Sequence, residues 1–167
     1  MRDDADIVGE SEHFISELHI DPDSLPVTSI EMQHERRVAI FDLIEDNAFR
    51  VEDSESGPYV VRLSLKDGQR LIFDVISSTG ADRGQFQISM VPFRRIIKDY
   101  FMICESYHNA IRTATSAQIE AIDMGRRGLH NEGSRLLSDS LRNQVEMGFN
   151  TSRRFFTLIC SLHRRPK

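Results

Sequence analysis

The sequence predicts an α+β fold, with an antiparallel β-meander of four to five strands packed against a long amphipathic helix and with further C-terminal helices. Two patterns support this expectation. Apolar and polar residues alternate in three consecutive runs between Tyr59 and Met90, as they do in strands that bury one face. From Phe93 onwards the apolar residues change to a spacing of three and four, which is typical of a helix.

The first residues of the chain differ from the rest in composition. Residues 1–12 are acidic and polar and contain no apolar run, which predicts a disordered acidic leader and not a signal peptide. The remaining residues, 13–167, suit a single α+β domain in size. No stretch approaches eighteen uninterrupted apolar residues, so no membrane span is expected.

Three elements are expected between the leader and the meander. Residues 13–20 are interpreted as a half-buried strand and residues 49–51 as a short strand. Residues 32–46 are interpreted as a helix. The residues expected on the buried face of the first strand are Phe14, Leu18 and Ile20, and those on the apolar face of the helix are Val38, Ile40, Phe41 and Ile44.

The meander is the clearest local signal in the chain. Its first two runs are joined by Asp67 and Gly68, the pair that a two-residue type I′ hairpin turn prefers. The alternating apolar residues are Tyr59, Val61, Leu63 and Leu65, then Leu71, Phe73 and Val75, and finally Phe86, Ile88 and Met90. A sheet of this kind has one apolar face that needs a cover, and we expect the helix of residues 93–114 to provide it.

A second long helix is expected after Thr115, which forms a capping box with Gln118. We expect residues 125–128 to interrupt or bend this helix and residues 131–134 to form a polar loop. Residues 145–149 alternate briefly and are interpreted as an added edge strand. Asn150 can cap the last helix.

The net charge of −5 conceals an asymmetry along the chain. Residues 1–57 contain 16 acidic and 4 basic residues, a net of −12, whereas residues 58–167 contain 10 acidic and 17 basic residues, a net of +7. Such a chain can neutralise itself by folding or can offer a basic face to an anionic partner.

Three segments resemble a known family. They are PFRRIIKDYFMICESY at residues 92–107, AIRTA at residues 110–114 and QIEAIDMGRRGLHNEGS at residues 118–134. Together they resemble an uncharacterised bacterial protein family of the UPF series, number zero-two-six-two. The resemblance extends from about His34 to the C-terminus and implies a bacterial, cytoplasmic protein. It implies no activity, and it transfers no functional residues.

The candidate site with the clearest chemistry is Gly125-Arg126-Arg127-Gly128. Two glycines around two arginines can expose backbone N–H groups to a phosphate while the guanidinium groups pair with it. The KH module holds nucleic acid in this way, with a GXXG loop between two helices. The alternative interpretation is a turn between helices with solvated arginines. Further basic residues lie early in predicted helices and have the same two interpretations: Arg94, Arg95, Lys98, Arg153 and Arg154.

The cysteines and histidines permit a metal hypothesis. Cys104 and His108 are four residues apart, and Cys160 and His163 are three apart, so two packed helices could offer a Cys2His2 set. Both cysteines also fall in apolar runs, where a free thiol packs as a small hydrophobe. Because no metal-finger spacing is present, we predict no metal and no cofactor.

Catalytic and nucleotide-binding motifs are missing from the sequence. No nucleophile elbow, Walker loop or dinucleotide-binding glycine pattern occurs. His130 and Ser134 are close to acidic residues, but proximity in sequence does not define a catalytic triad. The sequence therefore favours a non-enzymatic protein without deciding the question, and a small enzyme stays an alternative.

The leading hypothesis is a cytoplasmic protein-binding or adaptor module with an unidentified protein partner, and a homodimer is a further option. One alternative is an RNA- or phosphate-binding module that uses residues 125–128. The other is a metalloprotein or small enzyme that uses the cysteines and histidines.

Overall fold

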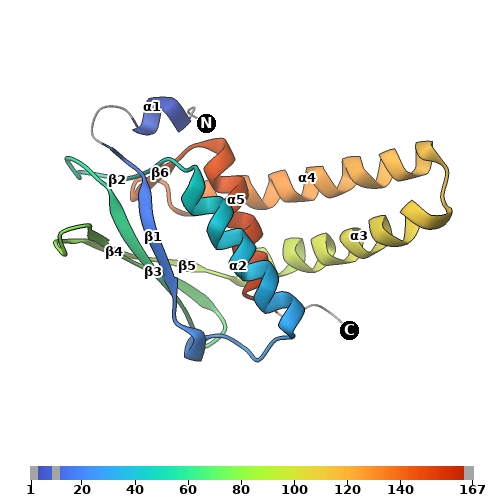
Figure 1. Ribbon diagram of the computed structural model, residues 1–167, viewed down its shortest axis with the longest axis horizontal. Coiled ribbons are helices and arrows are strands. Elements are labelled where there is room, and N and C mark those ends of the chain that lie inside the picture. Colours follow the sequence, from blue (N-terminus) through green and yellow to red (C-terminus); the bar gives the residue numbers. More distant parts are fainter. Residues whose placement is uncertain (1–3, 9–11, 164–167) are drawn as a thin grey trace.

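The computed structural model describes residues 4–8 and 12–163 (Figure 1). The main elements are α1 (Asp4–Val8), β1 (Ile15–Ile20), α2 (Ile30–Glu45), β2 (Phe49–Val51), β3 (Tyr59–Lys66), β4 (Arg70–Ser77), β5 (Asp82–Ser89), α3 (Arg94–Thr113), α4 (Ser116–Ser140), β6 (Val145–Met147) and α5 (Phe149–Ser161). Short 3₁₀ turns precede α2, as η1 (Pro22–Ser24), and α3, as η2 (Val91–Phe93). None of the helices among these residues has the length and apolar character needed to cross a bilayer.

The main sheet confirms the predicted α+β class and the meander. Its strand order is β1-β3-β4-β5, and β3, β4 and β5 are antiparallel neighbours. Asp67 and Gly68 both have positive φ, 55° and 66°, as a type I′ turn requires. The sheet is mixed, however, because β1 runs parallel to β3. Sequence alternation does not report strand direction, so this pairing was not predicted.

The buried face of β1 differs from the expected one. Ile15 and Leu18 are buried, whereas Phe14 and Ile20 are only partly buried. The pairing with β3 shifts register between Ile15 and Glu17. A bulge of this kind inserts one residue, so side chains three positions apart can point to the same face.

The apolar face of the sheet is covered mainly by α5. The ring of Phe155 lies 5.8 Å from that of Phe73 on β4 and 6.2 Å from that of Phe49 on β2. The predicted cover, α3, contributes Ile96 and Ile97 from its first turns to the core. The rest of α3 continues past the sheet and forms, with α4, a long hairpin that projects from the body of the protein (Figure 1).

Both short strands form, but they pair with each other. β2 and β6 make a separate antiparallel two-stranded sheet, in which Phe49 faces Met147 and Val51 faces Val145. All four of these side chains are buried. The predicted edge strand therefore exists at residues 145–147 and lies outside the main sheet.

The apolar face predicted for helix α2 is right in part, because Ile40 and Ile44 are partly buried and pack against the core. Met32, Ala39 and Leu43 are buried, whereas Val38 and Phe41 are 45% and 65% exposed. The helix carries apolar residues on two faces, and the packing against α5 and β1 selects one of them.

Helix α4 is continuous, so the predicted bend at residues 125–128 and the predicted loop at residues 131–134 are wrong. The capping box of Thr115 and Gln118 is present, and the helix runs from Ser116 to Ser140. Two of its glycines mark close packing. A Cβ at Gly125 would press on Ile103 of α3, and a Cβ at Gly133 would overlap the ring of Phe156 of α5. These glycines therefore lie at contacts between helices and not in a turn, and the contact at Gly133 leaves no room for a side chain.

The predicted acidic leader is described only in part. Asp4–Val8 forms the short helix α1, and its Ile7 is 2% exposed. Residues 1–3 and 9–11 lie outside the described residues, so disorder there stays a prediction. The Thr151 hydroxyl donates to a carboxylate oxygen of Asp4 at 3.2 Å. This contact joins the acidic N-terminal segment to the first turn of α5.

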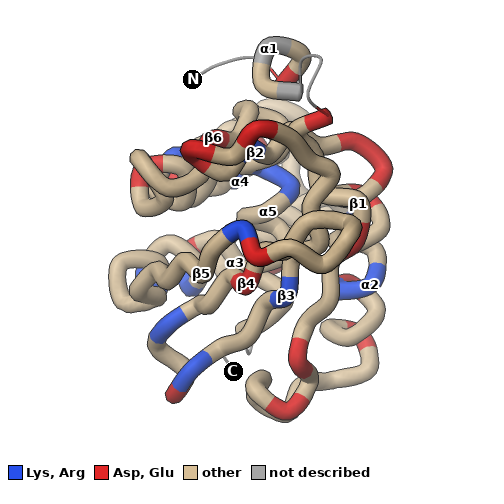
Figure 2. Tube along the Cα trace, turned by 90° about the vertical axis from the view of Figure 1, so that its left-hand side faces the viewer, with Lys and Arg blue, Asp and Glu red and all other residues tan. Residues whose placement is uncertain are grey.

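The charge asymmetry is partly neutralised within the fold. Arg154 of α5 donates to the backbone carbonyl of Asp46 at 2.9 Å, and its guanidinium lies 3.7 Å from the Asp46 carboxylate. Acidic residues are prominent around β1, β2 and β6 (Figure 2).

The two glycines at positions 128 and 133 give a matched test of the α4–α5 contact. We predict that Gly133→Ala lowers the free energy of unfolding by about 1–3 kcal/mol, because the added methyl group has no room beside Phe156. The methyl group added by Gly128→Ala would meet nothing within 4 Å. This substitution should raise the free energy of unfolding by about 0.5–1 kcal/mol, since alanine is the better helix former. Urea denaturation of both variants measures this. Equal effects of the two substitutions would contradict the packing described above.

Candidate anion-binding site

A cavity of about 370 Å³ lies where the start of α5 meets α3 and α4. Its lining is formed by Tyr100, Arg126, Arg127, His130, Asn150, Arg153, Arg154 and Thr157. Four of these eight side chains are arginines, and none is acidic. An accumulation of this kind is unusual in a chain with an overall charge of −5 and indicates a place where negative charge is favoured.

The two arginines from α4 are held in place by one carboxylate. Arg126 donates through Nε and Nη2 to Oδ1 of Asp123, at 3.1 and 2.6 Å. Arg127 Nε lies 3.2 Å from the other oxygen, Oδ2. The guanidinium of Arg126 also lies 5.1 Å from the ring centre of Tyr107, over its face. The hydrogen bond to Asp123 is the main reason that the pKa of Arg126 is raised, so this group stays charged.

The two arginines from α5 have different partners. Arg154 is paired with Asp46, as described above. Arg153 lies over the ring of Phe149, 5.8 Å from its centre. Its Nε is buried and has no hydrogen-bond partner among the described residues. A buried donor on a cation costs free energy until an acceptor reaches it, so this atom is a natural place for an anionic oxygen.

The charges around the cavity do not balance. Its four guanidinium groups face two carboxylates, those of Asp123 and Asp46. Asp123 is shared by two arginines, and Arg153 has no carboxylate within ion-pair distance among the described residues. An excess of two positive charges therefore remains, and a divalent anion would neutralise it.

His130 lies at the back of the cavity as a neutral ring. The Thr157 hydroxyl donates to the carbonyl of Arg153 at 3.2 Å. Thr157 Oγ1 also lies 2.8 Å from His130 Nε2, and these two atoms are hydrogen-bonded. Burial first, and then the charges of Arg153 and Arg126, lower the pKa of His130 to about 4. His130 thus adds no positive charge at neutral pH.

The structure changes the interpretation of residues 125–128. Arg126 and Arg127 line the cavity as side chains, but Gly125 and Gly128 lie inside α4, where backbone N–H groups bond within the helix. The KH-like exposed loop is therefore wrong. Arg153 and Arg154 join the α4 arginines from the other side. The sequence showed that both arginine pairs are basic, but no pattern in it indicated that the two pairs line the same cavity.

Asn150 lines the cavity but does not cap α5, contrary to expectation. Gly148 is the residue at the N-cap, and Asn150 lies in the first turn. A side chain at Gly148 would overlap Asp4 of α1, so the position is restricted to glycine by this approach. The correction moves Asn150 from a capping role to the wall of the cavity.

The cysteines and histidines do not form the Cys2His2 set that was considered. Cys104, His108 and Cys160 line a second and larger cavity between α2, α3 and α5. His163 does not line it, and its Nδ1 lies 2.8 Å from the carbonyl of Ile159. In the part of the chain that the structure describes, no three metal-ligating residues are grouped so that they could hold an ion.

Ser134 is not placed as a nucleophile. Its side chain is fully buried, and its hydroxyl donates to the carbonyl of His130 one turn earlier, at 2.7 Å. Back-bonding of this kind is a local feature of helices. The arrangement therefore gives no support to a serine-based reaction.

The neutral state of His130 predicts a pH dependence of stability. Its pKa is about 4 in the folded protein and 6.5 as a free side chain. The unfolded chain therefore takes up a proton first as the pH falls, and stability present above pH 6.5 is lost on approach to pH 4. Between pH 6.5 and pH 4, the free energy of unfolding of the wild-type protein should therefore fall by about 3 kcal/mol more than that of His130→Gln.

Urea denaturation of both proteins between pH 4 and pH 7 measures this difference. Because all other groups are common to both proteins, their titration cancels in the comparison. A stability difference that stays constant with pH would contradict a buried, neutral His130.

Comparisons with known proteins confirm the resemblance seen in the sequence. Residues 12–165 match the model of the "Uncharacterised protein family (UPF0262)". A UPF0262 protein of Phenylobacterium zucineum is 50% identical over 165 residues, which is 99% of both chains. A UPF0262 protein of Brucella anthropi is 53% identical over 144 residues, 86% of this chain and 89% of the relative.

A UPF0262 protein of Chelativorans is 57% identical over 136 residues, 81% of this chain and 84% of the relative. No solved structure matches the chain. The family model covers nearly all of the sequence, and these relatives are similar over most of their length. The chain therefore belongs to the uncharacterised protein family UPF0262.

Proposed function

We propose that this protein binds a small ligand carrying a phosphate group in the cavity between α3, α4 and α5. The observation that carries the proposal is the buried Nε of Arg153, which has no partner among the described residues, in a cavity with two excess positive charges. A phosphate offers several acceptor oxygens and about two negative charges, which match both features.

The size of the cavity favours a single phosphate-bearing group over nucleic acid. Its volume of about 370 Å³ is at the lower end of the range for small-ligand pockets. Nucleic-acid binding usually extends over a broad basic surface. Here the chain is acidic overall, and the four arginines line one cavity between α3, α4 and α5. The RNA-binding alternative is therefore less well supported than binding of a small phosphate ligand.

The proposal is one of binding and not of catalysis. The lining residues include no carboxylate, cysteine or serine that could act as base or nucleophile. The one imidazole, of His130, is neutral and is hydrogen-bonded through Nε2 to Thr157. These side chains can hold and orient an anion, which is the role of a carrier or a sensor.

A protein partner, the leading hypothesis from the sequence, stays a prediction. Phe41 of α2 is 65% exposed and lines neither cavity, and it is where such a partner would dock. If the same proteins copurify to an equal extent with the wild-type chain and with Phe41→Glu, a docking site at this surface is contradicted.

The direct test is calorimetric titration with inorganic pyrophosphate. Removing a charge-assisted hydrogen bond costs about 1.5–3 kcal/mol, so Arg153→Ala should weaken binding about tenfold to a hundredfold. Arg153→Lys should recover part of the affinity, because it restores the charge but not the planar donor pair.

The matched control is Arg135→Ala. Arg135 is an exposed arginine of the same helix as Arg126, and it does not line the cavity. Its removal changes the net charge equally and should leave the affinity unchanged. Equal losses in Arg153→Ala and Arg135→Ala, or no pyrophosphate binding by the wild-type protein, would refute the proposed site.

A further inference from the structure

The second cavity lies directly beside the arginine-lined one. It has a volume of about 940 Å³ and is lined by residues of α2, α3 and α5. The buried or partly buried part of its lining is mostly apolar and includes Ala39, Phe101, Cys104 and Cys160. Its volume suits an organic ligand of considerable size. Nothing in the proposed phosphate site uses this space.

Two residues form part of the walls of both cavities. Tyr100 of α3 and Thr157 of α5 line the arginine-lined cavity and the larger one. The Tyr100 ring packs edge to face on His130, with ring centres 5.4 Å apart. Burial and the neighbouring Cys104 raise the pKa of Tyr100, whereas Arg126 lowers it. Its hydroxyl therefore lies between a thiol of one cavity and a guanidinium of the other.

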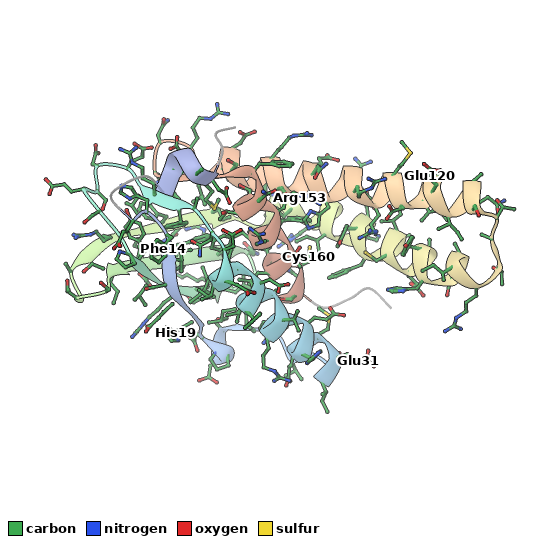
Figure 3. All side chains as sticks on the ribbon, turned by 45° about the horizontal axis from the view of Figure 1, so that its top comes forward. Phe14, His19, Glu31, Glu120, Arg153 and Cys160 are labelled. Atoms are coloured by element: carbon green, nitrogen blue, oxygen red, sulfur yellow. The ribbon has the colours of Figure 1, made fainter. Side chains whose placement is uncertain are left out.

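One face of α5 leads from the first cavity to the second. Positions 153, 157 and 160 are separated by four and three residues, so they share a helix face. Arg153 lines the first cavity, Thr157 lines both and Cys160 lines the second. Arg153 and Cys160 are labelled on α5 in Figure 3, and their backbone positions are about 10 Å apart along the helix axis. The distance is comparable to a short alkyl chain attached to a phosphate.

The buried part of the lining of the larger cavity is apolar and chemically unreactive. Burial, and then the nearby Cys104, raise the pKa of Cys160, so this thiol stays protonated. A protonated, buried thiol is inert and packs as a small hydrophobe. Beside it lie Phe101 and the exposed side chains of Met102 and Val38. A ligand group in this space would be stabilised by burial of apolar surface.

Charge determines how such a ligand would be oriented. The exposed lining of the larger cavity includes three carboxylates, those of Glu35, Asp42 and Glu105, and one ammonium group, that of Lys98. An anionic group is disfavoured at this mouth and favoured among the arginines of the neighbouring cavity. The apolar part of the ligand is left in the larger cavity.

We propose that the ligand is an amphiphile, a phosphate monoester with a short alkyl chain. Its phosphate lies among Arg126, Arg127 and Arg153, and its alkyl chain passes Tyr100 and Thr157 into the cavity beside Cys160. This inference rests on the proposed phosphate site and adds the class of molecule that the site takes. The occupant is a single molecule bound from solution, not a membrane surface.

The experiment is a calorimetric series of n-alkyl phosphates from methyl to octyl phosphate, each below its micelle concentration, with the full chain. Each methylene group buried in an apolar site contributes about 0.8 kcal/mol, so the affinity should increase roughly threefold to fourfold per added carbon. An affinity that does not depend on chain length, with pyrophosphate binding intact, would overturn this inference and leave the phosphate site standing. Loss of both would refute the two together.

Two matched variants locate the chain. Val38→Glu on α2 places a charge in the wall of the larger cavity, whereas Ile111→Glu changes a similarly exposed aliphatic residue on α3 that does not line it. The increase in affinity per carbon should be strongly reduced in Val38→Glu and kept in Ile111→Glu. Pyrophosphate binding should be unchanged in both. An unchanged chain-length dependence in Val38→Glu would place the chain elsewhere and contradict the proposal.

Discussion

Phe156 fills the space that Gly133 leaves beside α4, and the arrangement of the C-terminal helices depends on this contact. The ring is fully buried. It packs edge to face on His130 and on Tyr100, with ring centres 5.1 and 6.0 Å apart. Three helices thereby meet at one aromatic cluster. Arg126 lies one turn before His130 on α4, and Arg153 lies just under one turn before Phe156 on α5. The close approach of α4 and α5 therefore brings their arginines to the same cavity.

Bringing these arginines together has an electrostatic cost, and the surrounding residues reduce it. Asp123 and Asp46 offset part of the repulsion among the guanidinium groups. The neutral state of His130 avoids a further charge, because protonation of a buried ring beside Arg153 and Arg126 is unfavourable. The remaining excess of positive charge is tolerated within the fold and would favour the proposed anion. The same electrostatic balance thus links stability, pH dependence and the proposed binding.

The features predicted correctly from the sequence are those that local sequence signals determine. The type I′ turn at Asp67 and Gly68, the alternating strands and the capping box at Thr115 all form as expected. The predictions were wrong for features that depend on contacts between residues distant in the chain. Gly125 and Gly133 suggested breaks in α4, but the helix continues through both positions, and contact with the Phe156 ring requires a small residue at position 133. The parallel pairing of β1 and the exposed face of α2 likewise depend on partners distant in the chain.

For the same reason, the sequence indicated only part of the candidate site. It indicated Arg126 and Arg127 because glycines surround them, although these glycines lie within helix α4 and form no phosphate-binding turn. Arg153 and Arg154 follow some 27 residues later, and no local pattern joins the two pairs. Only the fold shows that His130 on α4 and Thr157 on α5, each about one turn after an arginine pair, are in contact.

The central claim is that an anion completes the cavity between α4 and α5. A crystal structure of the wild-type protein soaked in selenate tests it most directly, because selenium can be located by its anomalous scattering. The account predicts a selenate ion in the cavity, with an oxygen within hydrogen-bond distance of Arg153 Nε and further contacts to Arg126. Selenate bound only at exposed arginines, with the cavity empty or closed by a protein side chain, would contradict it.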